Sequence, residues 1–291
     1  MCIRDSTKIK GLTAFSHVLT ESNTTHKSVP MLMSSVTAHD FNSIYRQKGI
    51  ITAFKEAGYR TAFFSNQRYN HSFIDFFGKE ADICDFIKED TGDGSYNPSD
   101  DELLKLVAAE LAENASKQFI VLHTYGSHFN YRERYPADNA FFLPDFPVDA
   151  ELKYKDNLIN AYDNSIRYTD NFLARLIRML QEQDIDAAML YTSDHGEDIF
   201  DDDRHLFLHA SPVPSYYQIH VPFLVWMSDN YRKNYPDFLK NAEINRQKNI
   251  SSSASFFQTM LELGGIDTPS RNDSLSVINA SYTEKNRVYL N

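Results

Sequence analysis

Short apolar runs alternate with amphipathic segments along nearly the whole chain. Runs of strand length occupy residues 12–19, 60–65, 118–123, 187–191 and 220–226. Between them, apolar residues spaced three or four apart predict helices over 50–58, 102–114, 162–181 and 255–264. This alternation is typical of an α/β fold with a mostly parallel central sheet and helices on both of its faces.

Another helix is predicted to begin near Thr25. Capping residues, including Thr24, stand before the apolar Met31, and Pro30 is tolerated near a first turn. A hydroxyl at that place faces free backbone N–H groups and the positive end of the helix dipole, which favours anion binding. A plain N-cap role for either threonine remains open on this pattern alone. Ser99 and Glu102 form a capping-box pattern for the helix over 102–114, after a turn-rich connection at 91–100. Residues 66–77 read as an aromatic and polar loop.

Composition narrows the class of protein. The 291 residues are 42% hydrophobic and 13% aromatic, which suffices for a core, and neither repeats nor a linker divides them, so one domain is expected. The net charge is −11 without any cluster of basic residues, which argues against a nucleic-acid partner. Cys2 and Cys84 cannot form a disulfide framework. Because no apolar run is long enough to cross a bilayer, this chain alone is expected to be soluble.

The residues that could bind a metal or take part in catalysis follow the ends of the apolar strands. Asp194 and His195 follow the run 187–191, and ligands of open α/β sheets bind at the carboxyl ends of strands. One carboxylate oxygen beside one imidazole nitrogen suits Zn²⁺, and Gly196 permits a sharp turn. His209 follows within about fifteen residues, and His128 follows the exit of the strand 118–123. An ordinary strand-to-loop exit remains the simpler interpretation of Asp-His-Gly by itself.

Four blocks taken together resemble the alkaline phosphatase/sulfatase superfamily. They are Thr-His-Lys-Ser-Val-Pro at 25–30, Leu-His-Thr-Tyr-Gly-Ser-His at 122–128, Ala-Tyr-Asp-Asn-Ser-Ile at 161–166, and Ser-Asp-His-Gly-Glu at 193–197 with Leu-His at 208–209. Within the superfamily the chain is similar to the membrane-anchored phosphoethanolamine transferases that modify lipid A. The resemblance covers most of the chain and implies a single sulfatase-like catalytic domain over 1–291, partial at its N-terminus.

The resemblance implies roles for five residues. Thr25 would be the nucleophile and, with Asp194 and His195, a ligand of Zn²⁺, while His128 and His209 would contact the phosphoryl group or a second metal. Thr24 stays open as the alternative nucleophile, and whether a second metal binds is also open. Zinc beside a hydroxyl lowers its pKa and so makes an alkoxide nucleophile available.

The activity implied is zinc-dependent transfer of phosphoethanolamine from phosphatidylethanolamine to a cell-envelope glycolipid such as lipid A, through a phospho-threonine. The full-length protein would be anchored at the periplasmic face of the bacterial inner membrane. Three alternatives are kept: a sulfatase-like hydrolase of phosphate or sulfate esters, a phosphoglycerol transferase, and an inactive fragment of such an enzyme. The chain lacks the Cys/Ser-x-Pro-x-Arg motif of sulfatases, which disfavours the first.

The chain departs from the family at its start. No Gly-Glu-Ser/Thr motif precedes Thr25, so the family's Glu ligand and the first, central strand that carries it are expected to be missing. Glu21 is too close to Thr25 to replace that ligand. Two cysteines cannot supply the several disulfides of the best-known members, and the sequence does not specify the acceptor.

Overall fold

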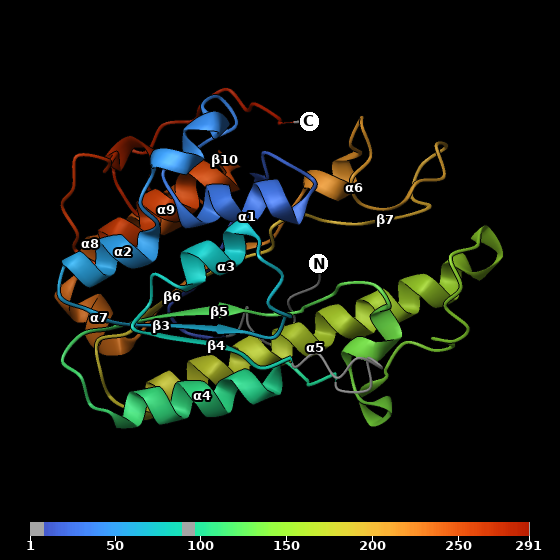
Figure 1. The fold of residues 1–291 in the computed structure, drawn as a ribbon, viewed down its shortest axis with the longest axis horizontal. Helices are drawn as coiled ribbons and strands as arrows, with labels where there is room; N and C mark the ends of the chain where they lie inside the picture. Colours follow the sequence, from blue (N-terminus) through green and yellow to red (C-terminus); the bar gives the residue numbers. More distant parts are fainter. Residues whose placement is uncertain (1–8, 89–96, 291) are drawn as a thin grey trace.

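The computed structural model describes residues 9–88 and 97–290, with strands in the middle and a layer of helices on each side (Figure 1). One layer contains α1 (Thr25–Met33), α2 (Ile50–Glu56), α3 (Phe73–Gly78) and α9 (Ser252–Leu263). The other contains α4 (Asp101–Ala112) and α5 (Lys155–Glu182). The predicted α/β class with helices on both faces is confirmed.

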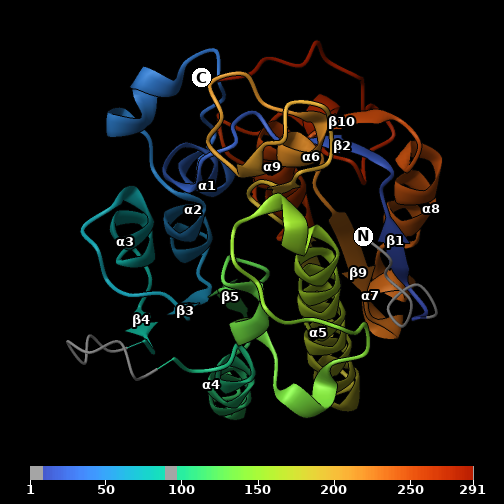
Figure 2. The same cartoon turned by 90° about the vertical axis from the view of Figure 1, so that its right-hand side faces the viewer.

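The central strands fall into two groups of three. Strands β4 (Ile83–Phe86), β3 (Arg60–Ser65) and β5 (Gln118–His123) pair in parallel in the order β4-β3-β5. Strands β1 (Leu12–Ala14), β9 (Phe223–Met227) and β6 (Ala188–Thr192) have the order β1-β9-β6, with β9 antiparallel to both neighbours. Figure 2 shows the first group on one side of α5 and β9 with β1 on its other side. The strand arrangement is therefore mixed, with its parallel part in the first group.

Apolar packing between the sheet and the helices α4 and α5 follows the predicted periodicity. Phe64 of β3, Leu103 of α4 and Phe172 of α5 belong to one buried cluster. Phe172 and Leu176 lie on the stripe that sequence periodicity assigns to the inner face of α5. Each such side chain contributes about 1.5–3 kcal/mol on burial, so this cluster fixes the helices that cover one face of the sheet.

Three local predictions are wrong. Residues 12–19 form two strands, β1 and β2 (His17–Leu19). The chain changes partner between them, because Phe15 N donates to Phe223 O of β9 and Ser16 N donates to Arg246 O, just before β10. The second half of the predicted loop 66–77 forms α3, which Ser72 caps in a capping box with Asp75. The capping box predicted at Ser99 does not form. Asp100 occupies the N-cap of α4 without a side-chain cap bond.

The remaining elements were not predicted, because most are short and the longer α8 buries only Ala242 and Asn245. They are β7 (Asp198–Ile199), β8 (Phe207–Leu208), α6 (Tyr216–Ile219), α7 (Asp229–Asn234), α8 (Pro236–Asn245), β10 (Asn249–Ser251), and the 3₁₀ turns η2 (Phe41–Arg46), η3 (Tyr131–Arg134), η4 (Ala137–Asn139), η5 (Leu152–Tyr154) and η6 (Asp273–Leu275). Strand β10 pairs in parallel with β2, and β7 pairs antiparallel with β8.

Most of the turn-rich segment predicted at 91–100, and Cys2, lie outside the described residues. Cys84 of β4 is a free thiol. Among the helices of residues 9–88 and 97–290, none combines the length and apolar character needed to span a membrane.

Candidate active site

The hydroxyl of Thr25 lies at the start of helix α1 and faces the end of strand β6. Thr24 is the N-cap, with extended backbone, and its side-chain oxygen lies 3.2 Å from Ser22 Oγ. Thr25 is the first helical residue, and its Oγ1 lies 3.0 Å from Nε2 of His195. Of the two threonines, it is therefore Thr25 whose side chain meets the Asp-His pair.

The imidazole of His195 is buried, with 8% of the residue exposed, and one ring nitrogen is held by the backbone. Its Nδ1 lies 3.0 Å from the carbonyl oxygen of Gly196. Because a carbonyl only accepts, Nδ1 carries a hydrogen in this contact. The other nitrogen, Nε2, lies 3.0 Å from Thr25 Oγ1 and 3.4 Å from Asp194 Oδ2, so it is the ring atom that faces the other candidate ligands.

The carboxylate of Asp194 is stabilised in its charged form. Burial by itself raises the pKa of Asp194, but His195, the hydroxyl of Thr25 and His123 outweigh burial and lower the pKa overall. Ser28 Oγ, one turn into α1, approaches Asp194 Oδ2 at 3.4 Å. An ionised oxygen therefore stands beside the threonine hydroxyl.

A second pair of side chains adjoins His195. The rings of His195 and His209 have centroids 4.2 Å apart, and His209 Nδ1 lies 3.0 Å from Glu197 Oε1. This hydrogen bond to Glu197 raises the pKa of His209. Potential ligand atoms of His195, Glu197 and His209 all lie within 4.8 Å of one another.

This group has the chemistry of a zinc site. Two imidazole nitrogens and one carboxylate oxygen form a common zinc donor set. Glu197 Oε2 is buried and has no hydrogen-bond partner among the described residues, as expected of an oxygen reserved for a cation. The ligand set expected from the resemblance, Thr25, Asp194 and His195, uses the same imidazole, whose Nε2 lies 3.0 Å from Thr25 Oγ1 and 3.4 Å from Asp194 Oδ2. His195 thus belongs to both sets. Sequence reasoning missed Glu197 as a ligand, although it stands in the same Asp-His-Gly-Glu block.

The two histidines near the end of β5 occupy different environments. His128 is exposed, its Nδ1 lies 2.5 Å from Phe129 O, and its ring centroid is 6.2 Å from that of His209. It therefore lies at the rim of the site, close enough to share a ligand with His209. His123 instead bonds Ser65 Oγ through Nδ1 at 3.0 Å, and burial lowers its pKa. The hydrogen bond between His123 and Ser65 ties β5 to β3.

The loops that carry these side chains are held by specific contacts. The carboxylate of Asp100 accepts hydrogen bonds from Tyr125 N at 2.8 Å and Gly126 N at 2.9 Å, which positions the turn before His128. Gly196 is needed for space, because a Cβ there would lie 2.1 Å from Tyr217 O. The φ angle of Gly196 is not in the positive range, so the close approach of Tyr217, and not a left-handed backbone, is what requires glycine here.

Asn164 of the block 161–166 anchors the long loop 131–156. It is buried, its Oδ1 accepts from Phe141 N and Phe142 N at 2.9 Å, and its Nδ2 donates to Phe142 O at 3.0 Å. Tyr162 and Asp163 of the same block line the cavity at the site. Asn164 of this block therefore anchors the loop, and Tyr162 and Asp163 form part of the wall of the site.

Both carboxylate oxygens of Glu21 accept hydrogen bonds from neighbouring segments of the fold. Its Oε2 accepts from Ala38 N at 2.7 Å and its Oε1 accepts from Ser251 Oγ. The carboxylate therefore links the segment after α1 to β10.

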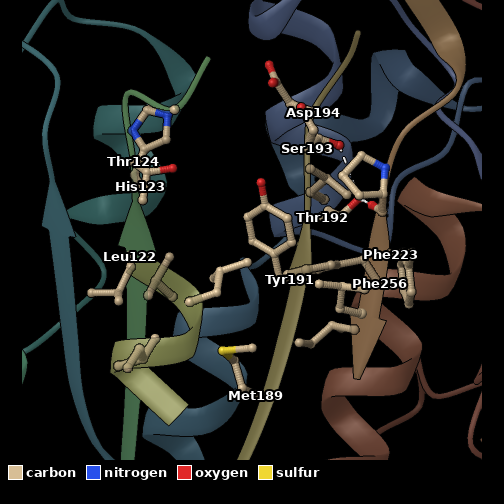
Figure 3. Close-up of a pocket in the computed structure, with 18 of the residues that line it drawn as sticks. Leu122, His123, Thr124, Met189, Tyr191, Thr192, Ser193, Asp194, Phe223 and Phe256 are labelled. Atoms are coloured by element: carbon tan, nitrogen blue, oxygen red, sulfur yellow. Dashed lines mark hydrogen bonds between the residues drawn. The ribbon is translucent and has the colours of Figure 1, made fainter. Parts of the chain in front are cut away.

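One continuous cavity of about 1360 Å³ joins the site to the interior. Thr25, His128 and His195 line it at the site, and it extends along β5 and β6 (Figure 3). The cavity gives the Thr25 hydroxyl access to a bound molecule.

Comparisons with known proteins agree with this arrangement. The family model described as Sulfatase matches residues 4–266. The chain is 25% identical over 284 residues to phosphoethanolamine transferase EptC of Escherichia coli O18:K1:H7, which covers 95% of this chain and 48% of EptC. Over 158 residues it is 37% identical to the Kdo(2)-lipid A phosphoethanolamine 7''-transferase of Escherichia coli K12, covering 53% of this chain and 27% of that protein.

The fold is similar to a solved structure, the C-terminal periplasmic domain of EptC from Escherichia coli in complex with Zn. The TM-score is 0.87 at 23% identity, and the match covers 98% of this chain and 80% of that one. The chain spans about half the length of the curated EptC that it matches.

Proposed function

The chain belongs to the sulfatase family, and we propose that within it the protein transfers phosphoethanolamine from a phospholipid, phosphatidylethanolamine, to a cell-envelope glycolipid such as lipid A. The observation that carries the proposal is the position of Thr25 Oγ1, 3.0 Å from His195 Nε2 at the N-terminus of a helix. The two curated relatives named above act on phosphoethanolamine, and one of them on Kdo(2)-lipid A.

Thr25 serves as the nucleophile in this proposal. Its oxygen bonds to the phosphorus of the donor as the bond from phosphorus to the diacylglycerol oxygen breaks, and the leaving diacylglycerol takes up the proton that Thr25 loses. An acceptor oxygen then bonds to the same phosphorus as the bond to Thr25 Oγ1 breaks, and Thr25 regains a proton from the acceptor hydroxyl or from water. The free N–H groups at the start of α1 and the imidazoles of His128 and His209 lie where they can stabilise the phosphoryl oxygens.

Zinc is the proposed cofactor, bound at one site that includes His195. Glu197 and His209, or Asp194 and Thr25, would complete the ligand set around that imidazole. Bound there, zinc supplies the positive charge that lowers the pKa of a neighbouring hydroxyl and offsets charge on a phosphoryl group. The similar EptC domain was solved in complex with Zn.

The proposed location is the periplasmic face of the bacterial inner membrane, with the longer protein anchored in that membrane. The similar EptC structure is that of a periplasmic domain. Both proposed substrates are membrane lipids, so the mouth of the cavity would face the bilayer surface.

A transfer assay tests this function. The full-length, zinc-loaded protein is incubated with phosphatidylethanolamine labelled in its headgroup, with lipid A as acceptor, and lipid products are separated. Labelled lipid A supports the proposal. Free phosphoethanolamine without labelled lipid A would indicate a hydrolase, and transfer from phosphatidylglycerol alone would indicate a phosphoglycerol transferase.

A further inference from the structure

The side chain of Gln218 is completely buried beside the candidate active site, in the short helix α6. Its Oε1 accepts a hydrogen bond from Asn23 Nδ2 at 2.6 Å. Its Nε2 donates to the carbonyl oxygen of Leu208 at 3.1 Å and to Ser211 Oγ at 2.8 Å. The oxygen and both hydrogens of this amide group are therefore used.

Two of these partners belong to segments that carry candidate reacting side chains. Asn23 precedes Thr25 by two positions, and Leu208 directly precedes His209. Helix α6 lies next to the start of α1 in the fold (Figure 1). The side chain of Gln218 thus connects the segment of the proposed nucleophile to the segment of one site histidine.

The main chain of Gln218 holds a third segment of the site. Its carbonyl oxygen accepts from Gly196 N at 2.9 Å, and Gly196 directly follows His195. A Cβ on this glycine would lie 2.1 Å from Tyr217 O, so α6 and the turn after β6 pack closely here. One residue is therefore bonded to all three segments.

The partners of Gln218 suit an amide side chain. Leu208 O is a carbonyl and only accepts, so the NH₂ group must face it and the oxygen must face Asn23. Asn23 is oriented in the same way, because its Nδ2 also donates to Ser211 O at 3.0 Å while its Oδ1 accepts from the hydroxyl of Tyr289. An aliphatic side chain at position 218 would leave buried polar groups unpaired.

The backbone on both sides of His209 is strained. Leu208 and Ala210 have φ angles of 66° and 65°, in the left-handed region that residues other than glycine rarely adopt. Such conformations persist only where the surrounding structure determines them. Gln218 Nε2 donates to Leu208 O, and Asn23 O accepts from Ala210 N at 3.2 Å. The hydrogen-bonded pair of Gln218 and Asn23 therefore holds both strained residues.

We propose that Gln218 is a positioning residue, which fixes the hydroxyl of Thr25 relative to the two histidine rings of the site. It acts through Asn23, Leu208 and Gly196. Displacing a reacting group by about 1 Å can slow a reaction about 10²-fold, so this arrangement bears directly on the rate. The effect on the rate rests on the proposed function, whereas the fixed arrangement of the three segments does not.

Hydrogen exchange tests the arrangement without reference to the reaction. In the full-length protein, Gln218→Met removes the side-chain hydrogen bonds and keeps the length of the side chain. We expect peptides covering residues 206–211 to exchange about tenfold faster or more, relative to peptides of β3. Unchanged relative exchange in Gln218→Met would overturn the proposal.

Asn245→Ala is the matched control. It also removes two hydrogen bonds of a buried amide side chain, from Asn245 Nδ2 to Val277 O and to Asn279 O, both at 3.0 Å. These bonds join α8 to the segment 277–279 and involve none of the three site segments. Asn245→Ala should therefore lose stability without faster exchange in residues 206–211.

Steady-state transfer separates positioning from a merely stabilising role. The zinc-loaded, full-length variants are assayed with phosphatidylethanolamine and lipid A at a temperature at which circular dichroism shows each variant to be folded. We expect Gln218→Met to lower kcat about 10²-fold while the KM for phosphatidylethanolamine changes less than about threefold. Asn245→Ala should keep both constants. A normal kcat in folded Gln218→Met, or a raised KM with normal kcat, would overturn the proposal.

A second variant decides if Gln218→Met does not fold. Asn23→Ala keeps Gln218 in place and removes its side-chain link to the segment of Thr25. It should show the same faster exchange of residues 206–211 and the same fall in kcat, and normal values of both would contradict the proposal. If the unsubstituted protein does not transfer phosphoethanolamine, the proposed function fails, and hydrogen exchange still decides the role of Gln218.

Discussion

The hydroxyl oxygen of Thr25 lies 3.0 Å from Nε2 of His195, although 170 positions of sequence separate the two residues. One stands at the N-terminus of α1 and the other follows the carboxyl end of β6. Helix N-termini favour anions, and ligands of open α/β sheets bind outside the carboxyl ends of the strands. Their meeting at one hydroxyl is what makes Thr25 a candidate nucleophile.

Substitution of Thr25 should abolish transfer. We expect Thr25→Ala to lower turnover by roughly 10³ or more, because no other hydroxyl occupies its place, while zinc content stays mostly intact. Thr24→Ala is the matched control and should retain activity, since the Thr24 side chain makes no cap bond. Headgroup transfer and metal content are measured on both. A Thr25→Ala variant that still transfers would remove Thr25 from the mechanism.

Zinc binding should depend on Glu197. We expect Glu197→Gln to weaken zinc affinity about 10- to 100-fold, because the amide keeps the shape of the side chain but loses its charge. Glu182→Gln, at the exposed end of α5, is the control and should bind zinc normally. Competition with a chromophoric chelator gives the affinities. Unchanged affinity in Glu197→Gln, with loss in Asp194→Asn, would favour the ligand set Thr25, Asp194 and His195.

Glu21 should make stability fall as pH rises. Burial is the main cause that raises the pKa of Glu21 above its ordinary value of 4.5, so the folded state holds the proton more tightly than the unfolded chain does. This contribution is fully present below about pH 4.5 and is lost as pH rises through the folded-state pKa. We expect Glu21→Gln to remove this loss, by about 1.4 kcal/mol for each unit of pKa shift.

Urea unfolding between about pH 4.5 and 8 measures the effect of Glu21→Gln. Glu182→Gln should keep the pH dependence of the unsubstituted chain, because its side chain is exposed. Parallel pH profiles for the unsubstituted chain and Glu21→Gln would show that Glu21 titrates alike in both states, contrary to this account.

Loss of Asn164 should release the loop 131–156. We expect Asn164→Ala to lower the free energy of unfolding by about 1–3 kcal/mol, because two backbone N–H groups lose a buried acceptor. Limited proteolysis should then cut the loop near Phe142 first. Asn160→Ala removes one exposed hydrogen bond, to Pro144 O, and should change neither stability nor cleavage appreciably. Equal protease resistance of the two variants would contradict the anchoring role.

The sequence predicts the long elements well because their signals are local. The apolar runs and periods predict β3, β5, β6, α4 and α5 to within a few residues of their observed bounds. Strand β10 has only three residues, and α8 buries only Ala242 and Asn245, so neither shows a clear apolar period. The break between β1 and β2 depends on contacts of Phe15 and Ser16 with distant strands, which no local pattern reports.

The candidate site is predicted in part. The resemblance identifies Thr25, His195 and His209, and the structure brings the side chains of these three together. The sequence did not predict Glu197 as a candidate ligand, because a carboxylate in a polar loop cannot be distinguished from a solvent-exposed one until its burial is known. The role of Asp100 in holding Tyr125 and Gly126 depends on tertiary contact, and its sequence context suggested only a helix cap.

Mass spectrometry of the zinc-loaded, full-length protein after incubation with phosphatidylethanolamine, without acceptor, tests the central claim most directly. The account predicts a phosphoethanolamine adduct that fragmentation maps to Thr25, that is absent in Thr25→Ala, and that disappears when lipid A is added. Transfer to lipid A by a protein that never carries the adduct on Thr25, or an adduct mapped to Thr24 or another residue, would contradict it.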